Sequence, residues 1–279
     1  ITTPQLQMTA GGRINSVTKS SGRGGNITIN ATDSLSISGE FPDDISEPLF
    51  NLGPVHQSGI FASTVGGKCA GLCGDAGYIS ITTASLTMGS GSQIDNGTSS
   101  NGHGGDIVIH ATNQISTSGT LSDSSPVGIF SRTTGTSPDA GSGGNIALTA
   151  GQSVAISNGA SVSASSTGPG NAGNIHINAG QNLDLRDSSI KTEAAQASGG
   201  NIDIQAVDRV RLVNSTVSTS VLGGAGGGGN ITIDPNVVIL QNASFFFANA
   251  IQGNGGNITI YTPLFLADST SLVSASSQF

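Results

Sequence analysis

Acidic side chains are the first groups in this sequence whose type and spacing could do chemistry. Asp43 and Asp44 form the only adjacent acidic pair, and Glu47 lies three residues further on. A polysaccharide hydrolase needs two carboxylates on either side of the scissile bond. The remaining acids that we expect on the outer faces of strands belong to different segments: Asp95, Asp184 and Asp203. The acidic residues therefore do not favour catalysis, although a single calcium ion in the acidic stretch 40–47 stays open.

Histidines and cations are equally dispersed. The four histidines, His56, His103, His110 and His176, do not follow the spacing of a metal-ligand set. Gly102-His103-Gly104 resembles a catalytic stretch of polygalacturonases, but the glycine pair of the internal repeat explains the match. Four of the cations are scattered as well: Arg186, Lys191, Arg209 and Arg211. We expect no catalytic residue, no bound metal and no cofactor.

Charge and hydropathy exclude two classes of partner. The net charge is −8, and the chain has only 9 lysines and arginines. Nucleic acids and anionic membrane surfaces attract clustered cations, and no basic cluster occurs here. No apolar run reaches the roughly 18 residues of a membrane helix, and no signal peptide is visible. We expect a mature fragment whose targeting signal lies outside these residues.

A six-residue motif of the type Gly-Gly-Asn-Ile-x-Ile appears eight times. Its copies begin at Gly24, Ala76, Gly104, Gly143, Ala172, Gly199, Gly228 and Gly255. From Asn145 onward the copies are 27 or 29 residues apart. A fixed period of this length is typical of a solenoid, in which each unit buries its apolar face against its neighbours. The glycine pair marks a corner that requires either positive φ or close packing.

Two further short strands follow each motif. The second strand carries alternating apolar residues, as in Val154/Ile156, Leu183/Leu185 and Leu264/Leu266, and a third lies around Val162, Ile190, Val217, Phe245 and Leu272. An Asn or Asp often separates them, at 158, 187, 214, 242 and 268, because these residues tolerate left-handed backbone. Three strands per turn predict an all-β fold, a right-handed parallel β-helix of about nine coils. Its length would be about 40 Å at roughly 4.8 Å per coil.

The chain is expected to be a single solenoid over residues 1–279, with insertions at 40–58, 65–75 and 120–127. Insertions on one side of a solenoid often form its functional face. Phe61 and Phe130 follow the two insertions 40–58 and 120–127, at equivalent outward positions of the third strand. We predict that Asp43, Asp44, Glu47, Phe61 and Phe130 contact a ligand. The alternative is that the two rings pack under their own loops.

The motif together with Leu-x-Leu-x-Asn-Ser-x-Ile resembles the passenger repeats of filamentous-haemagglutinin-type exoproteins. The resemblance spans Leu6 to Val273, and it lacks the family's amino-terminal secretion domain. It implies secretion by the two-partner pathway, with an outer-membrane secretion partner, to the cell surface of a Gram-negative bacterium. Members of the family are mostly adhesins. The resemblance therefore implies a structural and adhesive protein whose partner is a host or abiotic surface, a glycan or a protein receptor.

An extracellular location bears on Cys69 and Cys73, which stand four residues apart in a glycine-rich stretch. Disulfides persist in oxidising compartments, so we expect these two residues to be paired. A metal site would need further soft ligands, and a redox pair would usually be Cys-x-x-Cys.

Two other functions remain as alternatives to the adhesin. One is a polysaccharide lyase or hydrolase on the same fold, and the other is a self-assembling filament subunit that joins through its coil ends. Large apolar residues near the carboxyl end are relevant to the filament hypothesis, because they could form a contact between subunits. We predict that Ile239, Phe246, Tyr261 and Phe265 point outward and form a contact surface covered by further chain or by another subunit.

Overall fold

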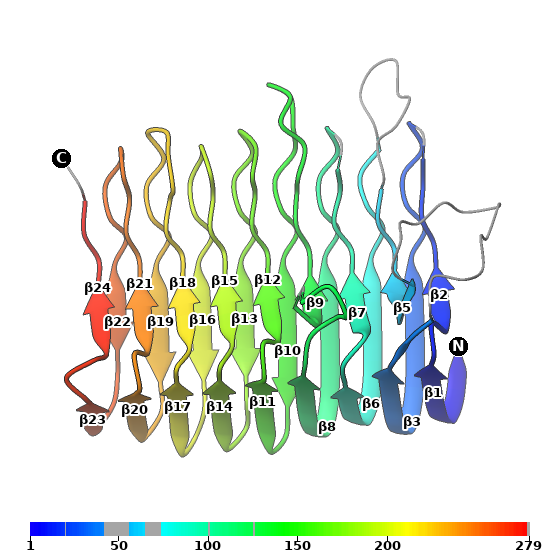
Figure 1. Ribbon diagram of the computed structural model, residues 1–279, viewed down its shortest axis with the longest axis horizontal. Coiled ribbons are helices and arrows are strands. Elements are labelled where there is room, and N and C mark those ends of the chain that lie inside the picture. Colours follow the sequence, from blue (N-terminus) through cyan, green and yellow to red (C-terminus); the bar gives the residue numbers. More distant parts are fainter. Residues whose placement is uncertain (20, 42–55, 65–73, 100, 125, 278–279) are drawn as a thin grey trace.

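The computed structural model describes residues 1–19, 21–41, 56–64, 74–99, 101–124 and 126–277. Within these ranges the regular secondary structure is entirely β, and no helix long and apolar enough to cross a membrane occurs. The strands stack along one axis into a rod, with the amino terminus at one end and the carboxyl terminus at the other (Figure 1).

One sheet of 14 strands is built from the first and second strands of every coil. Its long members are β1 (Thr2–Thr9), β3 (Ile27–Ser38), β6 (Ile79–Met88) and β8 (Ile107–Ser118). Its first-strand members are β10 (Ile146–Ala150), β13 (Ile175–Asn178), β16 (Ile202–Gln205), β19 (Ile231–Asp234) and β22 (Ile258–Ile260). Its second-strand members are β11 (Ser153–Ser157), β14 (Asn182–Arg186), β17 (Arg209–Val213), β20 (Val237–Gln241) and β23 (Leu264–Ala267).

The other sheet contains the third strands and is called the third-strand sheet below. Its parallel members are β2 (Arg13–Asn15), β5 (His56–Phe61), β7 (Ser92–Asp95), β9 (Gly128–Phe130), β12 (Ser161–Ser163), β15 (Ser189–Lys191), β18 (Thr216–Ser218), β21 (Phe245–Phe247) and β24 (Leu272–Ser274). A tenth strand, β4 (Glu40–Phe41), pairs with β5 in the antiparallel sense. The parallel stacking of successive coils confirms the predicted parallel β-helix of about nine coils.

Strands one and two are not separate in every coil, in contrast to the prediction. In β3, β6 and β8 they form one continuous strand, and β8 then pairs with both β10 and β11. Register shifts at Ala31/Ser34 and Thr83/Ser85 mark the bend inside the continuous strands. From β10 onward the break falls at turn residues such as Gly180, whose φ is +61°. A glycine at such a position ends the first strand.

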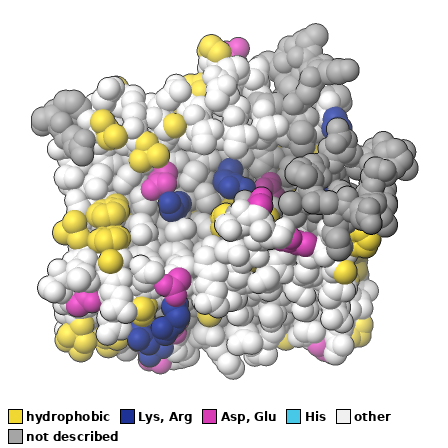
Figure 2. All heavy atoms as spheres, viewed as in Figure 1, with side chains coloured by type: hydrophobic (Ala, Val, Ile, Leu, Met, Phe, Trp, Pro, Cys, Tyr) yellow, Lys and Arg dark blue, Asp and Glu magenta, His cyan; other side chains and the backbone are white. Residues whose placement is uncertain are grey.

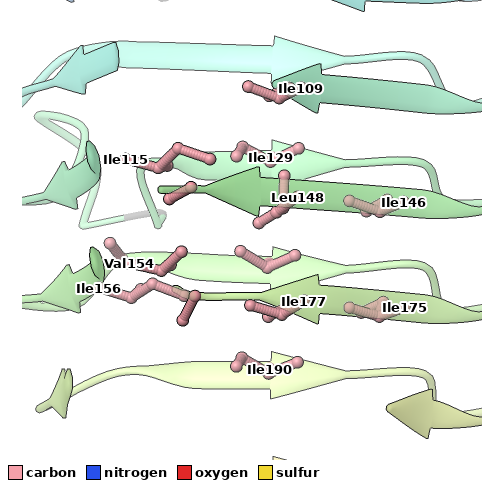
Figure 3. Close-up of a cluster of buried hydrophobic side chains, with 14 of the residues drawn as sticks. Ile109, Ile115, Ile129, Ile146, Leu148, Val154, Ile156, Ile175, Ile177 and Ile190 are labelled. Carbon is pink, nitrogen blue, oxygen red and sulfur yellow. The ribbon is translucent and has the colours of Figure 1, made fainter. Parts of the chain in front are cut away.

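The core is a set of stacked columns of aliphatic side chains inside the coils. Ile146 and Ile175 stack in one column, Val154 belongs to another, and Ile129 and Ile190 belong to the column of the third strands (Figure 3). These residues are almost completely buried. Each coil therefore covers its neighbours, as expected of a solenoid.

From Gly77 onward, the second glycine of each motif is required by close approach between coils. A Cβ built on Gly200 would lie 1.8 Å from the carbonyl oxygen of Gly173, and one built on Gly173 would lie 2.1 Å from that of Gly144. None of these three glycines has positive φ. Of the two explanations that the sequence offered, close packing is therefore the correct one.

Asn residues stabilise the corners in two ways. Asn158, Asp187, Asn214 and Asn242 are left-handed, with φ between 48° and 55°, as predicted. Asp268 is not left-handed, and instead its carboxylate accepts hydrogen bonds from the Asn242 N–H and the Ser271 hydroxyl. The motif asparagines form a ladder along the rod, in which each side-chain oxygen accepts the N–H of the next: Asn145, Asn174, Asn201, Asn230 and Asn257.

The prediction that Phe246 and Phe265 point outward is wrong. Phe246 is fully buried and stacks on Val217, and Phe265 lies in register with Val238 in the core column of the second strands. Apolar residues occupy every position of 245–247 and 264–266, so the period-two pattern does not define which face is inward. Phe245 and Leu272, which mark the predicted third strands of these two coils, face outward, and Phe246 and Val273 hold the core register.

Candidate functional site

A groove of about 250 Å³ lies on the outer face of the third-strand sheet, over β2, β5, β7 and the turns that follow them. Most of the residues that line it have polar side chains. Arg13, Gln57, Gln93, Asp95 and Arg132 supply its charged and amide groups, and Phe61 adds an aromatic ring.

The strand register explains why these residues meet. The core positions of the third strands are Ile14, Ile60, Ile94 and Ile129. The residues on either side of each core position face outward. One outward column is therefore Arg13–Gly59–Gln93–Gly128, and the next is Asn15–Phe61–Asp95–Phe130. Residues more than 30 positions apart in the sequence thus become neighbours on one face.

Phe61 and Phe130 occupy outward positions, as predicted, but their rings are covered. Each ring lies over the glycine two residues before it, because a Cβ at Gly59 would lie 2.8 Å from Phe61 ring carbons and one at Gly128 would lie 2.9 Å from Cζ of Phe130. The guanidinium carbon of Arg132 lies 4.0 Å from the Phe130 ring centroid. Phe61 is 9% exposed and Phe130 is 1% exposed. The rings therefore hold arginines in place rather than present an open aromatic surface.

Arg13 covers Phe61, with its guanidinium carbon 5.2 Å from the ring centroid. Its Nε donates to the backbone oxygen of Gln57 at 2.9 Å, and a terminal nitrogen donates to Gln57 Oε1 at 3.2 Å. Burial lowers the pKa of Arg13 below its ordinary range, and the group remains charged at neutral pH. These contacts fix the direction of one wall of the groove.

Side-chain amides form a chain of hydrogen bonds that runs from Gln57 across the third-strand sheet. Gln57 Nε2 donates to Gln93 Oε1 at 3.0 Å, and Gln93 Nε2 donates to the Pro126 oxygen at 3.3 Å. Gln93 itself is 9% exposed. Because each amide is tied to the next, the donors and acceptors along this wall keep fixed orientations.

Asp95 forms the floor between the two arginines. Its carboxylate lies 3.6 Å from a terminal nitrogen of Arg132 and accepts hydrogen bonds from the Ser63 hydroxyl at 2.9 Å and the Gly97 N–H at 2.8 Å. The carboxylate and the guanidinium offset each other's charge. The groove thus offers polar atoms of both kinds without a net charge from this pair.

The described parts of two insertions meet beside the groove. The Ser122 N–H donates to Glu40 Oε1 at 2.8 Å, and Thr120 pairs with Pro126. This contact places the described residues of the insertions 40–58 and 120–127 on one side of the rod, where we expect insertions to form a functional face. The expected insertion 40–58 is narrower, since Glu40–Phe41 and His56–Phe61 are strands. Asp43, Asp44, Glu47, Cys69 and Cys73 lie outside the described residues.

Stacking also brings together polar and charged side chains of the other sheet that are far apart in the sequence. Arg209 contacts both oxygens of Asp184, at 2.9 and 3.2 Å, and His176 Nδ1 lies 2.8 Å from Asp203 Oδ2. Each pair joins adjacent coils. Within the part of the chain that the structure describes, no group of three or more His, Cys, Asp or Glu side chains could hold a metal ion.

Three of the predicted contact residues near the carboxyl end reach the surface. Phe265 is 41% exposed on the last described coil, although it lies in the core register. Ile239 faces outward between Arg211 and Leu266, in register with both, and is partly buried. Tyr261 is 60% exposed and lines an open hollow together with Val207 and Asp234.

Sequence reasoning missed Arg13, Gln57, Gln93 and Arg132 as members of one site. The signal is that Arg13 and Gln93 share one outward column, where the later coils carry Ser161 and Ser189, while Gln57 and Arg132 lie two residues outside the columns. Comparison of the chain with protein-family models, curated proteins and solved structures found no significant match.

Proposed function

We propose that this protein is an extracellular adhesive rod that binds an uncharged glycan in the groove over β2, β5 and β7. The groove itself is the observation that carries the proposal. Its guanidinium, amide and carboxylate groups are held by one another, by two buried phenylalanines and by the backbone. Groups fixed before binding lose little conformational entropy when a ligand arrives.

The chemistry of the wall suits sugar hydroxyls. A hydroxyl both donates and accepts, and planar amide, carboxylate and guanidinium groups can each engage two neighbouring hydroxyls. Gln57, Gln93, Asp95 and Arg132 provide such groups within one groove.

The net charge of the chain favours a neutral ligand over a polyanion. Asp95 opposes Arg132 at 3.6 Å and Arg13 adds one positive charge to the groove, but the chain as a whole carries −8. A protein of this net charge repels polyanions at long range.

The contacts of the groove carboxylate, Asp95, favour a binding role over hydrolysis. Among the described residues that line the groove, Asp95 is the sole carboxylate, and it is engaged by Arg132, Ser63 and Gly97. Hydrolysis requires a second carboxyl group about 5–10 Å away. The proposed activity is therefore adhesion without bond cleavage.

The route of export belongs to the same proposal. The resemblance to filamentous-haemagglutinin-type passengers supports secretion by the two-partner pathway to the surface of a Gram-negative cell. A rod of stacked coils suits this role, since it carries a lateral binding face away from the membrane.

The test is an array of neutral and acidic oligosaccharides probed with the wild-type chain and two variants. Gln93→Ser with Asp95→Ser installs the residue type that Ser161 and Ser163 carry at the equivalent positions, so the fold should tolerate it. The matched control, Asp203→Thr, copies Thr232 on the other sheet. We expect neutral glycans to bind the wild type and the control, with at least about tenfold weaker binding by the groove variant.

Equal binding by the groove variant would remove the groove from the proposal. Shortened glycans in the reaction mixture would favour the polysaccharide-active enzyme instead. A preference for acidic glycans that disappears at high salt would overturn the neutral-ligand assignment.

A further inference from the structure

The groove is one end of a longer polar track on the third-strand sheet. Two outward columns continue from it along the rod. The first runs from Asp95 and Phe130 to Ser163, Lys191, Ser218 and Phe247. The second lies in the turn after the third strand and contains Arg132, Ser165, Glu193, Ser220 and Asn249. Each of these residues directly precedes a residue that forms a β-bridge to the neighbouring coil: Thr133, Ser166, Ala194, Val221 and Ala250.

The middle of the track consists of polar side chains, most of them short. Ser163 donates to Ser165 at 3.0 Å, Ser218 donates to Ser220 at 3.2 Å, and Lys191 lies 3.6 Å from Glu193. The serines are almost fully buried, with Ser163 6%, Ser218 1% and Ser220 8% exposed, so the partly exposed Lys191 and Glu193 are the main contact groups of this stretch. The cation is paired with its own acid, so this ion pair adds no net charge to the track.

The track ends at an aromatic pair. Phe245 and Phe247 face outward from β21, with ring centroids 5.0 Å apart and ring planes at 11°. Stacked in this way, each ring has one face that its partner does not cover. Hydrophobic side chains gather over this end of the rod in Figure 2. Leu272 on β24 is in register with Phe245 and is 52% exposed.

We infer that the ligand is a linear polysaccharide that lies along the rod, with one part in the groove and another against the Phe245–Phe247 pair. This inference rests on the proposed function and extends it to the length of the ligand. Six strand intervals separate β5 from β21, which is about 29 Å at roughly 4.8 Å per interval. A ligand that spans both sites needs on the order of six sugar units, since one unit is about as long as one interval.

Sugar rings fit the aromatic end for a physical reason. The face of an aromatic ring carries partial negative charge, and the axial C–H groups of a pyranose carry partial positive charge, so the two surfaces attract while burying apolar area. The Asn249 side-chain oxygen, two residues beyond Phe247, is already engaged by the Ser274 and Ser276 hydroxyls and the Ser276 N–H, so the aromatic faces are the sugar-binding groups at this end.

The experiment measures affinity against ligand length by isothermal titration calorimetry. Neutral oligosaccharides of the linkage that the groove binds are used, with roughly two and roughly ten units, so that only the longer spans about 29 Å. The variant Phe245→Thr with Phe247→Ser copies Thr216 and Ser218 of the preceding coil, and thermal melting checks its fold. The control is Ile239→Thr, an outward apolar residue of the same coil on the other sheet.

We expect the long ligand to bind wild type and control at least about tenfold more tightly than the short one, because its second contact is made intramolecularly. The aromatic variant should lose this gain and keep its affinity for the short ligand. An undiminished gain in the variant overturns the inference and leaves the groove proposal intact. Absence of binding at both lengths overturns the two together. Conversion of a wild-type dimer to a monomer by the variant, seen by sedimentation, would show that the aromatic pair joins two copies of the chain instead.

Discussion

Replacement of Gly200 by alanine should destabilise the rod by about 2–4 kcal/mol. The new Cβ would lie 1.8 Å from the Gly173 oxygen, whereas real Cβ contacts stay beyond 3.0 Å. The two coils must therefore separate locally by at least the difference, 1.2 Å. The bond from the Ile175 N–H to the Asn201 oxygen, now 2.9 Å, would then exceed hydrogen-bonding distance.

The magnitude follows from the bonds around this corner. The Gly200 N–H donates to the Thr192 oxygen at 3.1 Å, and the Thr192 hydroxyl donates to the Gly200 oxygen at 2.6 Å. A buried polar group that loses its partner costs about 1–3 kcal/mol, and overpacking by one methyl group costs a similar amount. Partial relaxation of the backbone keeps the total near about 2–4 kcal/mol.

Gly227→Ala is the matched control, because the nearest atom to its Cβ is 3.6 Å away. Its φ is not positive, so alanine should be neutral or stabilising by up to about 1 kcal/mol. Urea unfolding followed by circular dichroism gives the two differences. Hydrogen exchange of the segments 171–178 and 199–205 locates the lesion, since a solenoid can open locally. Equal stability of the Gly200 variant and the wild type would refute close approach as the reason for the glycine.

Other predictions test separate features. Phe246→Ala should lower the free energy of unfolding by about 3–5 kcal/mol, because the ring is fully buried, and a loss below about 1 kcal/mol in the same urea assay would contradict its inward direction. The pKa of Asp268 is lowered from 3.8 to about 2, mainly by the Asn242 N–H and then by the Ser271 and Thr270 hydroxyls, so its contribution to stability should be complete above 3.8 and lost as the pH falls through about 2. A carboxyl titration by nuclear magnetic resonance with a midpoint near 4 would rule that out. Cys69 and Cys73 should form a disulfide in the secreted protein, seen as the loss of two hydrogens by mass spectrometry, and two alkylatable thiols would show that the pair is reduced.

The fold was predictable because its signals are local and repeated. The motif from Gly199 to Ile204 contains a corner glycine, a ladder asparagine and two core residues. Six of the eight copies have asparagine at this place, and the other two have Tyr78 and Asp106. Alternation identified the inward residues wherever a polar residue separates two apolar ones, as in Val154/Ile156. It failed at Phe246 and Phe265, where no polar residue marks the outer face.

The groove was less predictable because it depends on register between coils of unequal length. Asn26 and Tyr78 are 52 residues apart, so the partner of Arg13 in the next coil cannot be read from a fixed period. The structure supplies that alignment by pairing Arg13 with Gly59 and Gly59 with Gln93. The burial of the Phe130 ring could not be predicted from the sequence either, since an outward position alone does not reveal that Arg132 lies over the ring.

The direction of the hydrogen bonds between coils has a mechanical consequence. The bonds in both sheets run along the rod axis, so a pulling force on the two ends acts directly on them. A force of this kind would peel the terminal coil one bond at a time and then pass to the next. The coil from Asn174 to Asn201 contains 27 residues, so the unfolding of one such coil should release about 90 Å of extended chain. A tethered rod would thus lengthen in regular steps and dissipate work under flow while the coils nearer its centre remain folded.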